Sequence, residues 1–322
     1  MLVDGLEVNI TSPDRLVFPQ AGITKMELVE YYLKVAEGAL RAVRERPMIL
    51  KRFPRGIDEE PFYQKRAPKG RPEWVRTCTI RFPSGRSADE VVCHHPATLA
   101  WLVNIGCVEL HPWPVRWDDI DHPDELRADL DPTPGVPFSQ VREVALMVRQ
   151  VLQEHGLEGF PKTSGSRGIH ILVPIERRYS FDQVRHAALA LAREVERRMP
   201  DVATSAWWKE ERQGVFIDYN QNARDRTLAA AFSVRPNPQA QVSCPLQWDE
   251  VPTVEPQELT LFTVPERFAR LGPLVPDPDT VARGRLESLL ELADQEGEAP
   301  LPPHHPKAKG EPRRVQPSRR RD

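Results

Sequence analysis

Residues 126–132 read Leu126-Arg127-Ala128-Asp129-Leu130-Asp131-Pro132. Apolar side chains occupy every second position, which is the period of a half-buried β-strand and places Asp129 and Asp131 on one face. Two close carboxylates raise each other's pKa unless a cation lies between them, and hard oxygen ligands select Mg²⁺ or Mn²⁺. The stretch therefore predicts either a metal-binding strand or a solvated acidic strand end before the turn Pro132-Thr133-Pro134-Gly135.

The composition sets broad limits on the class of protein. The 322 residues include 44 Lys and Arg against 47 Asp and Glu, a formal net charge of −3, and 40% are hydrophobic. This is typical of a globular protein and gives no bulk signal for nucleic-acid binding, although a local cationic face needs no net positive charge. The N-terminus lacks a basic region followed by an apolar run, and no apolar stretch is long enough to span a membrane. We therefore expect a cytoplasmic protein with no membrane partner.

The four cysteines are widely spaced and form no CxxC pair, so neither a disulfide framework nor a zinc ribbon is predicted. A His- and Cys-containing set lies within one stretch of the chain, but its spacing fits no usual zinc finger. Its members are Cys93, His94, His95, Cys107 and His111.

Helix and strand signals alternate along the chain. A capping-box pair opens a helix at Thr24 that should end near Arg46-Pro47. Further helices are predicted at 96–104, 139–155, 180–198 and 277–292, and strands at 48–53, 62–66, 78–82, 89–93, 126–131, 169–175, 214–219 and 227–234. This order predicts an α/β or α+β sheet core, with helices on one or both faces, behind a small β-rich module.

A third carboxylate, Asp218, ends the apolar run Val215-Phe216-Ile217 and precedes Tyr219-Asn220-Gln221-Asn222. With Asp129 and Asp131 it could hold two divalent ions, an arrangement in which one ion activates a hydroxyl and the other steadies a triphosphate. An Asx-type turn after the strand is the alternative.

The loop Thr163-Ser164-Gly165-Ser166-Arg167-Gly168-Ile169-His170 has the composition of a phosphate-binding turn. Glycines and small hydroxylated residues let backbone N–H groups approach phosphate oxygens, and Arg167 offers a bidentate donor. No Walker A motif occurs in the chain, and a Gly/Ser-rich segment of this kind can also be an ordinary turn.

Basic and aromatic residues interleave in Lys51-Arg52-Phe53-Pro54-Arg55 and again in Phe62-Tyr63-Gln64-Lys65-Arg66. This suits a surface on which bases stack on rings while cations meet phosphates. An antiparallel pair of strands with one aromatic core face explains the pattern equally well. His111 could contact a ribose or a phosphate, or could be structural.

In this order the motifs resemble the polymerase domain of bacterial ATP-dependent ligase D, a branch of the archaeo-eukaryotic primase superfamily. The resemblance covers about residues 8–285 and rests on Asp129-Leu130-Asp131, Thr163–His170, Phe216–Asn222 and Phe232-Ser233-Val234-Arg235. It implies an α+β primase-polymerase fold, with a mixed or antiparallel catalytic sheet flanked by helices and a smaller N-terminal α/β module. We expect residues 1–292 to form this domain, with a DNA-contacting module at 1–105 and the catalytic core at 106–292.

The resemblance also implies roles for individual residues. Asp129, Asp131 and Asp218 would be the catalytic residues and the ligands of two Mn²⁺ or Mg²⁺ ions. The residues implied at the incoming nucleotide are Ser164, Ser166, Arg167, His170 and Arg235, with His111 near its sugar. Those implied at DNA are Arg15, Lys25 and Lys51 at a 5′-phosphate, and Phe62 and Tyr63 against the template. Arg15 and Arg167 stand where many relatives carry lysine, so phosphate preference should differ.

The implied activity is template-dependent extension of a primer 3′-hydroxyl at short gaps or broken ends with NTPs or dNTPs, in end joining or gap repair. No KxDG ligase motif occurs, so a stand-alone protein that works at the nucleoid with a separate ATP-dependent ligase and Ku is expected. The alternatives are a primase that starts chains de novo, a non-catalytic DNA-end-binding recruitment module, and a metal-dependent nuclease.

Residues 293–322 are expected to form a disordered, Pro-rich basic tail. From Lys307 to Asp322 the chain carries seven Lys or Arg against two acidic residues. Such a tail is either a solubilising terminus or a weak contact to a phosphate backbone.

Overall fold

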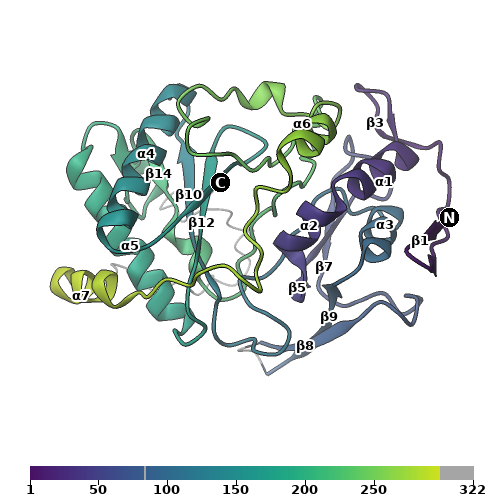
Figure 1. The fold of residues 1–322 in the computed structure, drawn as a ribbon, viewed down its shortest axis with the longest axis horizontal. Coiled ribbons are helices and arrows are strands. Elements are labelled where there is room, and N and C mark those ends of the chain that lie inside the picture. The colour runs from purple at the N-terminus through teal and green to yellow at the C-terminus, as the bar shows by residue number, and fades with distance from the viewer. Residues whose placement is uncertain (83–84, 298–322) are drawn as a thin grey trace.

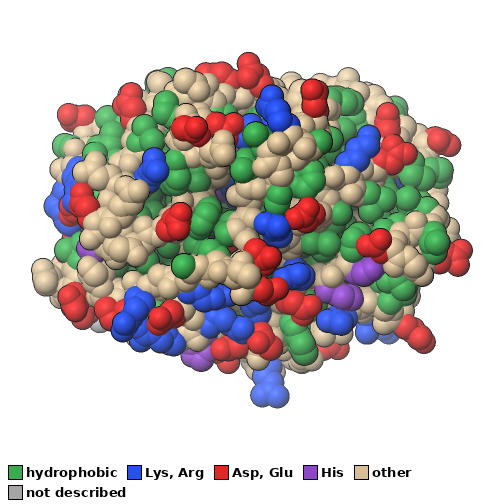
Figure 2. All heavy atoms as spheres, viewed as in Figure 1, with side chains coloured by type: hydrophobic (Ala, Val, Ile, Leu, Met, Phe, Trp, Pro, Cys, Tyr) green, Lys and Arg blue, Asp and Glu red, His purple; other side chains and the backbone are tan. Residues whose placement is uncertain are grey.

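The computed structural model describes residues 1–82 and 85–297. Helices α4 (Phe138–Glu154) and α5 (Phe181–Arg198) lie with the largest sheet in one half of the molecule (Figure 1). Helices α1 (Lys25–Lys34), α2 (Ala36–Val43) and α3 (Pro96–Asn104) lie in the other half. Over the described residues, no helix is long and apolar enough to cross a membrane. Figure 2 shows Lys and Arg side chains interspersed with Asp and Glu over the face it presents.

The first predicted helix is two helices, α1 (Lys25–Lys34) and α2 (Ala36–Val43), so the prediction of one helix to Arg46-Pro47 is wrong. The capping box at Thr24 is confirmed, with the side chains of Thr24 and Glu27 each accepting from the other's backbone N–H. Between the two helices the backbone of Val35 leaves the helical region. The break lets α2 turn against Phe232, where a Cβ on Gly38 would lie only 2.4 Å from the ring.

The remaining N-terminal elements are short strands and α3 (Pro96–Asn104). The pairs are antiparallel: β1 with β2, β3 with β4, β6 with β7, and β9 with both β5 and β8. Their bounds are β1 Leu2–Val3, β2 Leu6–Glu7, β3 Leu16–Phe18, β4 Ile23–Thr24, β5 Arg46–Met48, β6 Leu50–Arg52, β7 Phe62–Gln64, β8 Thr77–Arg81 and β9 Ser87–Cys93.

The main sheet has five strands in the order β11-β12-β10-β14-β13. All its pairs are antiparallel except β13 with β14, so the predicted mixed sheet is confirmed. The bounds are β10 Glu125–Pro132, β11 Phe160–Thr163, β12 Ile169–Pro174, β13 Ala203–Thr204 and β14 Val215–Ile217. The central strand, β10, is the strand predicted from residues 126–131.

Strand β10 buries its apolar face under α4 and α5. Leu126, Ala128 and Leu130 join a hydrophobic cluster with residues of both helices. Because side chains alternate along a strand, Arg127, Asp129 and Asp131 point to the opposite face. That face carries the site described below.

Residues 227–234 are not a strand, contrary to the prediction. Phe232 has a φ of 65°, and the segment carries residues 230–234 into the N-terminal hydrophobic cluster. That cluster contains residues between Val3 and Leu110 and also residues between Ala230 and Val264. Its members therefore lie on both sides of the boundary expected between the N-terminal module and the catalytic core, at residues 105 and 106.

The C-terminal part contains α6 (Val264–Leu271) and α7 (Glu287–Glu296). A helix was predicted from residue 277, but residues 277–286 are not helical. This segment runs beside the end of β12, where Ile175 and Gly284 form a β-bridge. Helix α7 continues past the expected boundary at 292; the rest of the expected tail, 298–322, lies outside the described residues. Three short 3₁₀ segments complete the fold: η1 Lys209–Glu211, η2 Tyr219–Asn222 and η3 Pro256–Glu258.

Candidate active site

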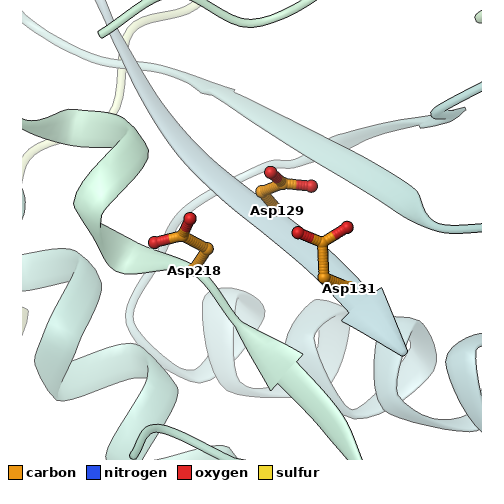
Figure 3. Close-up of side chains that lie close together, drawn as sticks. All are labelled: Asp129, Asp131 and Asp218. Atoms are coloured by element: carbon orange, nitrogen blue, oxygen red, sulfur yellow. The ribbon is translucent and has the colours of Figure 1, made fainter. Parts of the chain in front are cut away.

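Three carboxylates converge at the centre of the sheet (Figure 3). Asp129 and Asp131 come from β10, and Asp218 follows the neighbouring strand β14, where its N–H donates to the Asp129 carbonyl at 2.7 Å. One carboxylate oxygen from each of the three lies within 4.8 Å of the others. We call these residues the carboxylate triad.

The environment of the triad disfavours three negative charges. Burial, followed by the charge of Asp218, raises the pKa of Asp129 to about 7. The charge of Asp129, followed by burial, raises the pKa of Asp131 to about 8. Added cations would relieve this repulsion, and hard divalent ions match these all-oxygen donors.

Asp218 also forms the Asx-type turn that the sequence offered as the alternative to a metal site. It caps η2, with Oδ1 accepting from Asn220 N at 2.9 Å and Oδ2 accepting from the Gln221 side chain at 3.0 Å. These bonds hold the carboxylate in place beside β10, so the turn and the triad are compatible.

The predicted nucleotide residues gather beside the triad in one cleft of about 280 Å³, which we call the central cleft. Asp129 and Asp131 line this cleft, and so do all six predicted nucleotide residues: His111, Ser164, Ser166, Arg167, His170 and Arg235. The cleft thus places hydroxyl and cationic side chains next to carboxylates.

The glycine-rich loop between β11 and β12 is folded by its own serine. Ser164 Oγ accepts from the N–H groups of Ser166 at 3.2 Å and Gly168 at 3.0 Å. These two N–H groups therefore have a partner inside the loop, and the side chains of Ser166 and Arg167 are exposed.

Both glycines of this loop are required by close packing. A Cβ on Gly168 would lie 2.3 Å from the carbonyl oxygen of Leu130 on β10. Gly165 has a φ of +70°, and a Cβ there would lie 2.4 Å from Cγ of Arg235. The glycines thus allow the loop to press against both the triad strand and Arg235.

His170 links the loop to the triad. It is the cross-strand partner of Asp129, and its Nε2 lies 3.2 Å from Asp129 Oδ1. Its Nδ1 lies 2.5 Å from Nζ of the buried Lys162, a residue that we did not predict. With Nδ1 accepting from the Lys162 amine, the ring hydrogen lies on Nε2, on the side of Asp129.

Glu109, also not predicted, lies behind two residues that line the cleft, His111 and Arg235. Its side chain is fully buried, with Oε2 2.5 Å from Lys51 Nζ and 3.3 Å from His111 Nε2, and Oε1 2.7 Å from Arg235 Nε. Burial alone would raise the pKa of Glu109, but the hydrogen bond with His111 and the nearby cations hold it well below its usual range. The alternation of buried Val108 and Leu110 with Glu109 and His111 was the sequence signal for this pair.

Of the residues expected at a 5′-phosphate, Lys25 and Arg15 lie together. The backbone N–H of Lys25 donates to the backbone carbonyl of Arg15 at 2.8 Å. Burial, followed by the charge of Arg15, lowers the pKa of the Lys25 side chain. The Lys25 ammonium contacts the Thr11 carbonyl and lies 3.4 Å from Asn104 Oδ1. Lys51, by contrast, makes its ion pair with Glu109.

The two predicted aromatic residues lie on β7. Phe62 and Tyr63 pair with Arg52 and Lys51 of β6, and their side chains are 44% and 49% exposed. The antiparallel pair therefore exists, but its rings do not form a core face. The Arg52 guanidinium lies 5.0 Å from the centre of the Phe62 ring.

The His- and Cys-containing set does not form a metal site. His95 caps α3 through Nδ1, and Cys93 is buried in β9. Within residues 1–82 and 85–297, the carboxylate triad is the one group of three or more metal-binding side chains with ligand atoms this close.

Comparison with known proteins gives consistent matches. Residues 24–275 match the family described as "LigD, primase-polymerase domain". The chain is 32% identical over 306 residues to the "Multifunctional non-homologous end joining protein LigD" of Mycolicibacterium smegmatis, covering 93% of this chain and 40% of that protein. It is 33% identical over 268 residues to the protein of the same description from Pseudomonas aeruginosa, covering 82% of this chain and 32% of that protein.

A solved structure described as "Polymerase Domain from Mycobacterium tuberculosis Ligase D in complex with DNA" is similar with a TM-score of 0.80 and 31% identity. The similarity covers 86% of this chain and 99% of that one, whereas the chain spans 40% or less of the two full-length relatives above. The predicted α+β primase-polymerase fold is therefore confirmed.

Proposed function

Because the chain belongs to the family of LigD primase-polymerase domains, as its motifs predicted, we propose that it is a template-dependent nucleotidyltransferase. It extends a primer 3′-hydroxyl at short gaps or broken DNA ends with NTPs or dNTPs, in non-homologous end joining or gap repair at the nucleoid. The observation that carries this proposal is the central cleft, which sets the carboxylate triad beside side chains suited to a triphosphate.

A polymerase domain of this kind is metal dependent, and the triad fits that requirement. Asp129, Asp131 and Asp218 present only oxygen donors, and the raised pKa values of the first two record a deficit of positive charge. We assign the three residues to two Mn²⁺ or Mg²⁺ ions. When bound, such ions lower the barrier by orienting the hydroxyl and neutralising charge on the α-phosphate and the pyrophosphate.

The chain's own side chains bind and orient the nucleotide. Arg167 and Arg235 offer cationic donors to the triphosphate, while Ser164 and Ser166 add hydroxyl donors. His170, whose Nδ1 contacts Lys162, lies opposite Asp129 and connects the end of the loop to β10. His111 also lines the cleft, and we assign it to the sugar of the nucleotide.

The N-terminal residues are suited to DNA. Lys25 is the first residue of α1, so a buried cation lies beside the positive end of a helix dipole and next to Arg15. A 5′-phosphate bound there would offset this concentration of positive charge. The exposed rings of Phe62 and Tyr63 supply a platform for stacking template bases.

The activity is tested by primer extension on a gapped template bearing a 5′-phosphate, with Mn²⁺ and either ribonucleoside or deoxyribonucleoside triphosphates. Templated extension is expected, stronger with ribonucleotides, and Asp129→Ala with Asp131→Ala should abolish it without loss of DNA binding. Binding without extension by the wild-type protein would favour a recruitment module, and products on an unprimed strand would favour a primase. A separate ATP-dependent ligase and Ku are the proposed partners.

The 5′-phosphate assignment has its own test. Replacing Arg15 by Ala removes an exposed cation, so the preference for a phosphorylated over an unphosphorylated gap should fall about threefold to tenfold at moderate ionic strength. Extension of a primer on an open template, which lacks the phosphate, is the control and should not change. An unchanged preference in the Arg15→Ala variant would contradict the assignment.

A further inference from the structure

Glu109 is a carboxylate shared by Lys51 and by two residues that line the central cleft, His111 and Arg235. Lys51, His111 and Arg235 come from separate parts of the chain, and all three reach its two oxygens within 3.3 Å. Glu109 is 1% exposed, whereas Arg235 and His111 line the cleft. The carboxylate therefore lies behind the groups that a ligand would touch.

The charges of this cluster do not balance. Lys51 and Arg235 carry two positive charges against the single negative charge of Glu109, and His111 adds donor capacity. A buried carboxylate is retained only when it is paired, and here the pairing leaves positive charge facing the cleft. A site with this surplus attracts an anion, as the triad beside it attracts cations.

The three contacts also fix geometry. Lysine and arginine side chains lose rotamer freedom when they bind a ligand, and a shared carboxylate that holds them beforehand removes part of that cost. Arg235 is bonded on both sides, because its Nη1 donates to the Ser164 carbonyl at 3.1 Å. The cluster thus ties the glycine-rich loop to β6 and to the segment that carries His111.

We propose that Glu109 is a positioning residue that holds Lys51, His111 and Arg235 as one preorganised wall for the anionic part of the incoming nucleotide. The inference deepens the proposed function and rests on it. It moves Lys51 from the 5′-phosphate, where the family resemblance placed it, to the nucleotide.

Loss of the Glu109 charge should therefore act on nucleotide binding. Replacing Glu109 by Gln keeps its shape, but it removes the charge that holds Lys51 and Arg235. We expect KM for the nucleotide to rise about tenfold, with a smaller change in kcat, because the reacting groups at the triad are untouched. The affinity for gapped DNA and for Mn²⁺ should not change.

The matched control is Glu90→Gln. Glu90 is also fully buried, but its Oε2 accepts from Trp113 Nε1 at 2.8 Å, and Trp113 does not line the cleft. This variant makes the same Glu-to-Gln replacement at the same degree of burial away from the cleft, so its nucleotide KM should equal that of the wild type.

Lys51→Met provides a test that leaves Glu109 in place and does not depend on the folding of Glu109→Gln. The inference requires a higher nucleotide KM and an unchanged preference for a 5′-phosphorylated gap. The reverse result, a lost 5′-phosphate preference with an unchanged nucleotide KM, would overturn it, and so would an unchanged KM in a folded Glu109→Gln protein.

These outcomes are separable from failure of the proposed function. If the wild-type protein does not extend a primer, the polymerase proposal falls. Calorimetric binding of a non-hydrolysable nucleoside triphosphate then still decides the role of Glu109, since affinity should weaken about tenfold in Glu109→Gln and remain unchanged in Glu90→Gln. Equal affinity in all three proteins would overturn the inference.

Discussion

The carboxylate triad lies at the central cleft and Glu109 lies behind two residues that line it, yet their surroundings shift the pKa values of their carboxyl groups in opposite directions. Burial and mutual repulsion raise the pKa of Asp129 and of Asp131, whereas three partners hold that of Glu109 well below its usual range. The first cluster has too little positive charge and the second has a surplus. A nucleotide that carries a negative triphosphate with its metal ions would satisfy both.

The comparison also separates two uses of a buried acid. The carboxylates of the triad repel one another and destabilise the metal-free protein, but the same charges are needed to bind an added cation. Glu109 is satisfied within the fold and serves by holding other side chains. Substitutions in the two clusters should therefore have opposite effects on stability, although both should harm activity.

The largest effect is expected at Asp131. Replacing it by Asn removes one metal ligand, and primer extension should fall by about a thousandfold or more. Because the change also relieves repulsion with Asp129, the metal-free protein should become more stable by roughly 1–2 kcal/mol. Urea unfolding in the presence of a chelator measures this. A loss of stability would break the contrast between the clusters.

The next largest effect concerns Glu109. Replacing it by Gln leaves the partly buried cations Lys51 and Arg235 without their counter-charge, and the free energy of unfolding should fall by about 3 kcal/mol. Thermal and urea unfolding at neutral pH would show it. An unchanged stability would mean that the ion pairs contribute nothing net to the fold and that the two clusters differ only in their ligands.

A smaller, pH-dependent effect on stability is expected at Glu90. This buried acid belongs neither to the carboxylate triad nor to the cluster around Glu109. Burial raises its pKa to about 8. The folded state therefore holds a proton that the unfolded chain releases, so stability is present at low pH and is lost as pH rises through 8. The loss is at most about 1.4 kcal/mol per pH unit.

Glu90→Gln should remove this contribution, because the amide cannot ionise. Unfolding free energies at about pH 5.5 and about pH 8.5 should therefore differ less in the variant than in the wild type. The triad contributes a slope of the same sign to both proteins, so it cancels in the comparison. Identical slopes would show that Glu90 is ionised in the fold at neutral pH.

Part of the site could be predicted from the residue pattern, and the family resemblance implied the rest. Asp129 and Asp131 could be placed on one face of a strand from period alone, and the sheet register then brought His170 opposite Asp129. The family resemblance, not the residue pattern, implied the six nucleotide residues and the mixed sheet. All six residues line the central cleft, and the sheet is mixed.

The failures have physical causes that local sequence does not carry. Residues 227–234 are apolar enough for a strand, but tertiary packing of Phe232 against α2 bends them into a turn. Strand β11 contains Pro161 and Lys162, which hide it from a search for apolar runs. Glu109 and Lys162 were missed because their partners are distant in sequence, and a single buried charge shows its purpose only beside those partners.

The contrast between the clusters is tested most directly by calorimetry of Mn²⁺ and of a non-hydrolysable nucleoside triphosphate with three proteins: wild type, Asp131→Asn and Glu109→Gln. We predict that Asp131→Asn loses Mn²⁺ binding, whereas Glu109→Gln keeps it and binds the nucleotide about tenfold more weakly. Mn²⁺ binding that survives in Asp131→Asn, or nucleotide affinity that is unchanged in Glu109→Gln, would contradict the division of the cleft into a cation site and an anion site.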